Sequence, residues 1–291
     1  MDRWLKLKYW ISCFLPYNKN EVEVLFLETT NRCNSSCVFC HHHLMRRPVK
    51  DMDFKLVQSL LSRVRPKLVV FHVFGEPLLY PNVVEAVQYA TSLGVSSMLD
   101  TNGQLLGEDL FVRLCEAGLG RLVFSFGAVT KEVYESIWRG CNFDTVSRNI
   151  RKAYLLKRGR GFGTNVTIRP IVTRENRHQL SSIEEVWRPF CDTFEVVNEF
   201  HLYGYDRIPL VRLDRPDCKQ LHSLYRNCVI RANGDMDLCC FDSDGDFVVG
   251  NVLERDIMDL WRGEVFESFR RRIYKDKDFP SICLECPVCP K

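Results

Sequence analysis

The chain of 291 residues carries 40 Lys and Arg against 37 Asp and Glu, a net charge of +3, and 46% of its residues are hydrophobic. This composition predicts a globular protein with a sizeable core, in one large domain or one domain with a small appendage. The intermixed charges favour no nucleic-acid partner, and no apolar run is long enough to span a bilayer.

Residues 1–20 are expected to form an N-terminal extension rich in Trp and Lys. Charged residues run through its short apolar stretch and no cleavage site of small residues follows, so it does not read as a secretory signal. A segment of this kind can lie on a membrane surface. Packing against the body of the protein or against a partner is the favoured interpretation, so membrane association is not expected.

From residue 21 to residue 200 the sequence alternates between short β-rich runs and longer runs with helical spacing. Strands are expected within 21–30, 67–77, 95–103, 121–127, 163–172 and 193–200, and helices within 54–64, 81–94, 110–118, 143–157 and 180–190. Six strand–helix units in a row predict a parallel sheet with right-handed crossovers, as an open barrel or a doubly wound sheet. Polar residues follow several strand ends, for example at Glu76, Asn102 and Ser125, which favours the barrel.

The alternation stops after residue 200. Residues 201–227 read as a connector, and residues 228–291 as a small cysteine-rich α+β domain. Within that domain, residues 228–242 predict a hairpin that turns at Asn233-Gly234, and a helix is expected near 256–273. The predicted fold class is therefore α/β, a partial (β/α)6 TIM-like barrel over residues 21–200 with this small C-terminal domain.

Fourteen cysteines are present, and nine of them fall in two sets. The first set is Cys33, Cys37 and Cys40; the second is Cys228, Cys239, Cys240, Cys283, Cys286 and Cys289. Without an export signal, clustered cysteines indicate metal in a reducing cytoplasm rather than disulfides. The scattered remainder, Cys13, Cys115, Cys141, Cys191 and Cys218, are expected to be small apolar residues.

The first set supplies three thiolates from the single loop "CNSSCVFC". Zinc is the usual partner of paired cysteines, but a [4Fe–4S] cube held by three cysteines leaves one iron open to another ligand. His41, His42 and His43 follow so closely that none is expected to reach the open corner, and solvated or supporting roles are favoured. An open iron suits a chelating ligand with an amine and a carboxylate, which Glu76 and Asn102 are of the right type to hold.

These stretches resemble the radical SAM superfamily. "CNSSCVFC" resembles its C-x-x-x-C-x-Φ-C signature, "FGEPLLYP" its GGEP motif, and the segment from "LVFSFG" to "YLLK" its Ser-Asp-Gly…Arg-Gly-Gly region. The closing region, "CVIRANGDMDLCC…GNVLERDIMDLW…CLEC", resembles the SPASM or twitch extensions of some members. Together the matching stretches cover most of residues 22–289.

The resemblance implies that S-adenosylmethionine (SAM) chelates the open iron and is cleaved reductively to methionine and a 5′-deoxyadenosyl radical. It assigns the cluster to Cys33, Cys37 and Cys40, and cofactor contacts to Phe39, Gly75, Glu76, Asn102, Ser125 and Arg139. Phe39 would border the adenine, and Gly75 and Glu76 would take the methionine amine. The chain departs from the family pattern at two positions of this pocket: Phe74 replaces the first Gly of GGEP, and Phe126 replaces the Asp that often follows Ser125.

The second cysteine set resembles a twitch domain with one auxiliary [4Fe–4S] cluster, held by Cys228, Cys239, Cys283 and Cys286. Cys240 and Cys289 are left without an assigned role. Full ligation by protein favours an electron carrier, and a structural zinc site is the alternative.

The expected function is hydrogen abstraction from a small molecule, followed by loss of an electron to the auxiliary cluster, a net oxidation. Arg169, Glu199, His72 and His201 are candidates by residue type for the base that takes the proton. A flavodoxin or ferredoxin is expected as the electron donor. The protein is expected to be cytoplasmic. Two alternatives stay open: a maturase that crosslinks or epimerises a ribosomal peptide, disfavoured by the few residues before the first strand, and a non-catalytic iron–sulfur electron-transfer protein.

Overall fold

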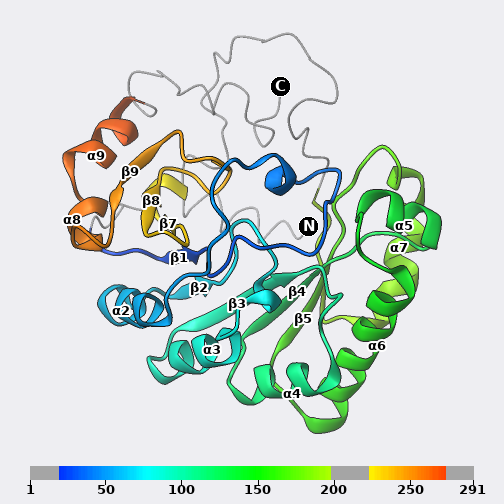
Figure 1. Ribbon diagram of the computed structural model, residues 1–291. Coiled ribbons are helices and arrows are strands. Elements are labelled where there is room, and N and C mark those ends of the chain that lie inside the picture. The colour runs from blue at the N-terminus through cyan, green and yellow to red at the C-terminus, as the bar shows by residue number, and fades with distance from the viewer. Residues whose placement is uncertain (1–19, 198–222, 273–291) are drawn as a thin grey trace.

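A computed structural model describes residues 20–197 and 223–272 of the chain (Figure 1). Six parallel strands lie side by side in chain order: β1 (Val24–Leu27), β2 (Leu68–Val70), β3 (Ser96–Thr101), β4 (Arg121–Ser125), β5 (Asn165–Arg169) and β6 (Thr193–Phe194). A doubly wound sheet would reverse its strand order at a switch point. The uninterrupted order is that of a barrel wall, so the predicted partial barrel is confirmed.

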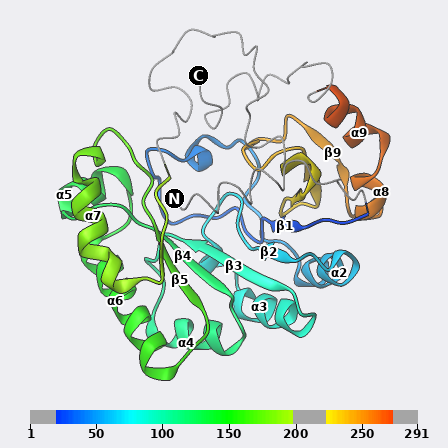
Figure 2. The same ribbon diagram turned by 180° about the vertical axis from the view of Figure 1, so that it is seen from behind.

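The barrel helices cover the outer side of these strands, as both views show (Figures 1 and 2). They are α2 (Phe54–Val64), α3 (Val83–Ser92), α4 (Glu108–Glu116), α5 (Lys131–Ile137), α6 (Phe143–Arg160) and α7 (Leu180–Trp187). Short 3-10 helices are η1 (His41–Leu44), η2 (Pro77–Leu79), η3 (Arg177–Gln179), η4 (Arg188–Phe190) and η5 (Ser223–Tyr225). Of the helices, α2 has the predicted bounds because Asp53 caps its first turn, where its side chain accepts from the Lys55 N–H at 2.8 Å.

The core lies between the strands and the helices. Alternate strand residues enter it and are fully buried, among them Leu25, Leu27, Val69, Leu99, Leu122, Phe124, Val166 and Ile168. Because side chains alternate along a strand, the residues between them face the inside of the barrel. The barrel therefore has an apolar outer layer and a separate inner face.

The C-terminal part continues the same sheet. β7 (Asn227–Ile230) pairs in parallel with β1, and β8 (Asp235–Asp237) and β9 (Val248–Asn251) follow as antiparallel strands. The predicted hairpin is confirmed, with Gly234 at φ 91° in its turn. The predicted junction at residue 228 falls within β7, so the barrel and the C-terminal part share one nine-stranded sheet.

The single helix predicted near 256–273 is wrong. The structure has two helices there, α8 (Ile257–Trp261) and α9 (Glu264–Arg271), on either side of Gly263. A Cβ at Gly263 would lie 2.8 Å from the carbonyl oxygen of Asp259, so only glycine allows the chain to turn there.

Within residues 20–197 and 223–272, no helix combines the length and the apolar character that crossing a membrane requires.

Candidate active site

The first cysteine set lies in the loop that follows β1. The Ser35 hydroxyl lies 3.2 Å from the Cys33 sulfur and 3.5 Å from the Cys37 sulfur. The Cys40 sulfur accepts a hydrogen bond from the backbone N–H of His42 at 3.5 Å. The thiols are close enough that Cys33 and Cys40 both raise the pKa of Cys37, and Cys33 raises that of Cys40. One short loop therefore gathers three sulfur donors.

These thiols have the properties of cluster ligands that ionise on metal binding. Burial raises the pKa of Cys33 and Cys37, and it raises the pKa of Cys40 to about 11. A buried thiolate needs a cation beside it, which bound iron supplies. In the two described segments no three His, Cys, Asp or Glu side chains form a ready-made metal site. The donor set thus fits a three-cysteine cluster.

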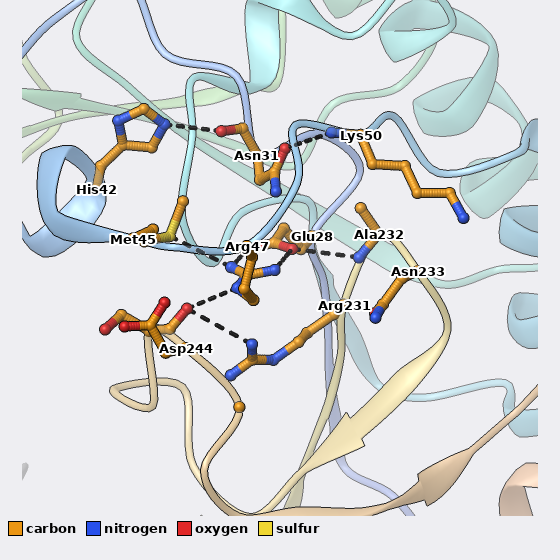
Figure 3. A network of polar contacts seen from close by, with 12 residues as sticks. Glu28, Asn31, His42, Met45, Arg47, Lys50, Arg231, Ala232, Asn233 and Asp244 are labelled. Carbon is orange, nitrogen blue, oxygen red and sulfur yellow. Dashed lines mark hydrogen bonds and ion pairs between the residues drawn. The ribbon is translucent and has the colours of Figure 1, made fainter.

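The three histidines after the loop have different surroundings. Nε2 of His42 lies 2.7 Å from the carbonyl oxygen of Asn31 (Figure 3). His41 is buried, which lowers its pKa, and His43 is exposed. The contact of His42 with the backbone supports a role outside the ligand set for that residue.

The turn at residues 75–77 packs directly against the cysteine loop. Gly75 has φ 101°, and a Cβ there would lie 2.4 Å from the carbonyl oxygen of Thr30 and 2.9 Å from that of Arg32. The Glu76 N–H donates to the same Arg32 oxygen at 2.7 Å. Two backbone segments touch here, so glycine is required.

The Glu76 side chain joins two strand ends. Its carboxylate accepts hydrogen bonds from the Thr101 hydroxyl (2.6 Å), the Asn102 N–H (2.8 Å) and the Leu78 N–H (3.1 Å). Burial raises its pKa to about 7, against the lowering effect of these donors. A carboxylate has about four acceptor sites, and three are filled from within the protein. The Glu76 carboxylate therefore has about one acceptor site left for the expected contact with an amine.

Asn102 after β3 contacts the loop directly, and Ser125 at the end of β4 connects to it through Trp138. Nδ2 of Asn102 donates to Oδ1 of Asn34 at 2.8 Å. The Ser125 hydroxyl accepts from Nε1 of Trp138 at 3.2 Å, and the Trp138 ring packs edge-on against Phe39 with 5.4 Å between ring centroids. These contacts connect the loop to the ends of β3 and β4.

The segment after α5 closes the other side of the loop. The Arg139 carbonyl accepts the Ser36 N–H at 2.8 Å, and a Cβ at Gly140 would lie 3.0 Å from the Asn34 carbonyl oxygen. The Arg139 side chain is exposed. The structure thus gathers all six candidate cofactor residues around the cysteine loop: Phe39, Gly75, Glu76, Asn102, Ser125 and Arg139.

A fourth thiol lies beside the loop, at a position that the sequence assigned to the general core. Cys141 is 5% exposed, and its side chain interacts with those of Tyr134 and Ser35. Burial raises the pKa of Cys141 to about 12. The sequence contained one indication of this position. Cys141 directly follows Arg139-Gly140, where the family motif has glycine.

The inner face of the barrel carries a network of charges. Arg169 on β5 forms ion pairs with Asp100 on β3 and with Glu195 just after β6, the latter at 3.0 Å. Arg121 on β4 pairs with the same Glu195 at 2.6 Å. The sequence singled out only Arg169 of these four. The available signal was a charged residue at alternate positions of otherwise apolar strands.

His72 follows β2 beside this network. Asp100, Arg169 and Glu28 are the charged groups that act on it. Burial is the main cause of its lowered pKa, so the imidazole is neutral near pH 7. In the described part of the chain its buried Nδ1 has no hydrogen-bond partner. A neutral imidazole nitrogen at the inner face is suited to accept a proton.

Two of the four predicted auxiliary ligands lie within the described residues. Cys228 on β7 is 1% exposed, and continuing the β7–β8 register by one pair places it opposite Leu238, next to Cys239. Burial raises the pKa of Cys228, while the buried guanidinium of Arg270 acts in the opposite direction. The other predicted ligands, Cys283 and Cys286, and the unassigned Cys289 lie outside the described residues.

Comparison with known families gives the site its context. The model of the radical SAM superfamily matches residues 27–185, more than half of the chain, and that of an iron–sulfur cluster-binding domain, SPASM, matches residues 218–287. The chain belongs to the radical SAM superfamily. This radical SAM protein therefore uses SAM and a [4Fe–4S] cluster. Its SPASM region binds at least one additional iron–sulfur cluster.

Two relatives align along most of their length, whereas several others align over less than half of theirs. The tungsten-containing aldehyde ferredoxin oxidoreductase cofactor-modifying protein of Pyrococcus furiosus is 23% identical over 92% of this chain and 88% of its own. The SAM-dependent 2-deoxy-scyllo-inosamine dehydrogenase of Niallia circulans is 21% identical over 89% of this chain and 90% of its own. The structure of Streptococcus suis SuiB bound to precursor peptide SuiA is 16% identical with a TM-score of 0.63, covering 97% of this chain and 73% of that chain, a likeness in fold.

Proposed function

We propose that this radical SAM enzyme oxidises a small polar molecule inside the barrel and passes one electron to an auxiliary [4Fe–4S] cluster in the SPASM region. The observation that carries the proposal is the inner face, where Arg169 is held between Asp100 and Glu195 with His72 beside them. Such a face offers both donors and acceptors with balanced charge, which suits a substrate that carries hydroxyl or amine groups.

When bound, the first cluster and SAM would supply a 5′-deoxyadenosyl radical able to remove a hydrogen atom from carbon. Oxidation of an alcohol to a carbonyl takes one hydrogen atom, one electron and one proton from the substrate. The deoxyadenosyl radical would take the hydrogen atom, an auxiliary cluster would accept the electron, and the proton requires a base. A flavodoxin or ferredoxin would supply the electron that cleaves SAM.

His72 is the proposed base. Among the four candidates by residue type, Glu199 and His201 lie outside the described residues. The Asp100 and Glu195 carboxylates raise the pKa of Arg169 despite its burial, so Arg169 keeps its charge and accepts no proton. His72 is neutral and its Nδ1 has no partner in the described residues.

Cys228, Cys239, Cys283 and Cys286 are the proposed ligands of the auxiliary cluster. Four protein ligands leave no iron open, which suits an electron acceptor better than a substrate-binding site. The dehydrogenase of Niallia circulans, which aligns over 90% of its length, supports the same reaction class.

Turnover in vitro tests the reaction. The full chain, reconstituted anaerobically, is incubated with SAM, dithionite and a panel of aminocyclitols and sugar alcohols that starts with 2-deoxy-scyllo-inosamine. We expect 5′-deoxyadenosine, methionine and a carbonyl product in equal amounts. Absence of 5′-deoxyadenosine would favour the non-catalytic alternative.

Peptide maturation is the second candidate, because the SuiB fold is known with a precursor peptide bound. Affinity for a leader peptide, with 5′-deoxyadenosine formed only in the presence of that peptide, would favour it over oxidation of a small molecule.

Metal analysis tests the auxiliary cluster separately. In a Cys33→Ala/Cys37→Ala/Cys40→Ala variant, we expect about one [4Fe–4S] equivalent per chain to survive. Zinc in place of iron would indicate a structural site and remove the electron acceptor from the proposal.

A further inference from the structure

Arg47, seven residues after the last cysteine of the first set, connects that loop to the C-terminal part. Its Nη1 and Nη2 donate to the two carboxylate oxygens of Glu28 at 2.8 and 2.7 Å. Its Nε donates to the Ser243 carbonyl at 2.6 Å. Figure 3 shows the Arg47 guanidinium beside Glu28. Ser243 follows Cys239 and Cys240 by only a few residues, so one side chain spans the segments that carry both cysteine sets.

Glu28 fixes this contact to the shared sheet. It stands directly after β1, is 0% exposed, and its carboxylate also accepts the Ala232 N–H just beyond β7 at 3.2 Å. Paired hydrogen bonds between guanidinium and carboxylate are among the strong ones in proteins, and loss of one partner leaves the other charge buried. The Arg47–Glu28 pair is therefore a buried ion pair of fixed geometry, unlike an exposed pair at the surface.

Hydrogen bonds within residues 239–246 hold this loop together, so that its parts are expected to move as one unit. The Asp242 carboxylate accepts the N–H groups of Gly245 and Phe247, both at 2.9 Å, and the Asp242 N–H donates to the Cys239 carbonyl at 3.1 Å. The buried Arg231 donates to the Asp242 carbonyl. A displacement of the loop at Ser243 would therefore move Cys239.

We propose that Arg47 is a positioning residue that sets the place of the 239–246 loop, and with it the auxiliary metal site, relative to the first cysteine loop. The proposal rests on the assignment of Cys239 to a metal site and is independent of the substrate. Arginine suits this place because its planar guanidinium reaches both Glu28 oxygens and the Ser243 carbonyl from three separate nitrogens, whereas a lysine presents a single nitrogen.

The test compares Arg47→Met and Arg47→Lys with Arg46→Met. Arg46 is the matched control because it joins the same two segments through Asp244 at 3.3 Å, while its side chain is 78% exposed. The first readout is hydrogen–deuterium exchange of residues 239–246 in the full reconstituted chain. The second is the electron paramagnetic resonance signal of the C-terminal site, recorded with Cys33, Cys37 and Cys40 replaced by Ala.

We expect exchange in 239–246 to become at least about tenfold faster in Arg47→Met, which corresponds to about 1.4 kcal/mol. The resonance signal should shift or broaden in the same variant. Arg47→Lys should show a smaller change of both readouts, and Arg46→Met should match the wild type.

Unchanged exchange and an unchanged signal in Arg47→Met, with only a lower melting temperature, would overturn the proposal and leave Arg47 as an ordinary stabilising residue. If Arg47→Met does not fold, Arg47→Lys and Glu28→Gln are judged by the same two readouts. If the C-terminal site holds no iron, the electron-accepting function fails, while the exchange comparison still decides whether Arg47 positions the loop.

Discussion

The carboxylate of Glu76 accepts a hydrogen bond from the Thr101 hydroxyl at 2.6 Å, and both residues are 2% exposed. The same carboxylate accepts the Asn102 N–H, and the Asn102 side chain donates to Asn34 of the cysteine loop. Three successive strand ends are thus joined by one chain of buried polar contacts. The cysteine loop takes its position from Glu76 even though it is far from that residue in sequence.

Replacement of Glu76 by Gln is expected to destabilise the protein by about 1–3 kcal/mol, because the amide nitrogen would face donors and leave one of them unsatisfied. Thermal unfolding of the reconstituted chain measures this loss. Glu85→Gln, at an exposed position on α3, is the control and should unfold like the wild type. Equal melting temperatures for Glu76→Gln and Glu85→Gln would contradict the joining role of Glu76.

Glu76 also predicts a dependence of stability on pH. Burial raises its pKa from 4.5 to about 7, so the native state keeps this proton to higher pH than the unfolded chain does. The resulting stability is fully present below pH 4.5 and is lost as the pH rises to about 7. The advantage of the wild type over Glu76→Gln should therefore narrow between pH 4.5 and about 7. A gap that widens over this range would mean that the three donors outweigh burial.

Gly75→Ala is expected to lose iron from the first site. The added Cβ would lie 2.4 Å from the Thr30 carbonyl oxygen, which is backbone and cannot move without moving the cysteine loop. Gly94→Ala is the control, because Gly94 also has a positive φ of 72° but has no atom within 4 Å of the added Cβ. Gly94→Ala should cost only about 1–2 kcal/mol of backbone strain and keep its iron. Iron analysis and thermal unfolding separate the two effects, and full iron in Gly75→Ala would refute the close-packing interpretation.

The elements with strong local signals were predictable. Asp53 caps the helix that starts at Phe54, and the Asn233-Gly234 turn specifies the hairpin between β7 and β8. The parallel pairing of β7 with β1 was not predictable, since segments about two hundred residues apart leave no local pattern when they pair. For the same reason the sharing of one sheet across residue 228 was not visible in the sequence.

The candidate site shows the same division. Motif spacing made five site residues predictable: Cys33, Cys37, Cys40, Gly75 and Glu76. Asp100 and Glu195 belong to no motif, and their part in the site depends on which face of a strand meets Arg169 across the barrel. Such partners follow from the barrel geometry, which a single sequence does not display.

His72 gives the sharpest test of the reaction. In His72→Gln, product formation is expected to fall about 10²–10⁴-fold, the usual contribution of a general base. SAM cleavage without product should persist, because His72 has no assigned part in binding SAM. The wild-type rate should hold as the pH falls to 6.5 and drop below it, since burial lowers the pKa of His72 from that value. Product and 5′-deoxyadenosine are measured together, with any substrate that the wild type oxidises.

His178→Gln is the matched control, because His178 is exposed on η3 and its replacement should leave both products unchanged. Two results would exclude His72 as the proton acceptor. One is wild-type turnover in His72→Gln. The other is an equal loss of product and of 5′-deoxyadenosine, which would place His72 at the SAM-binding turn through its contact with the Gly75 backbone rather than at the substrate.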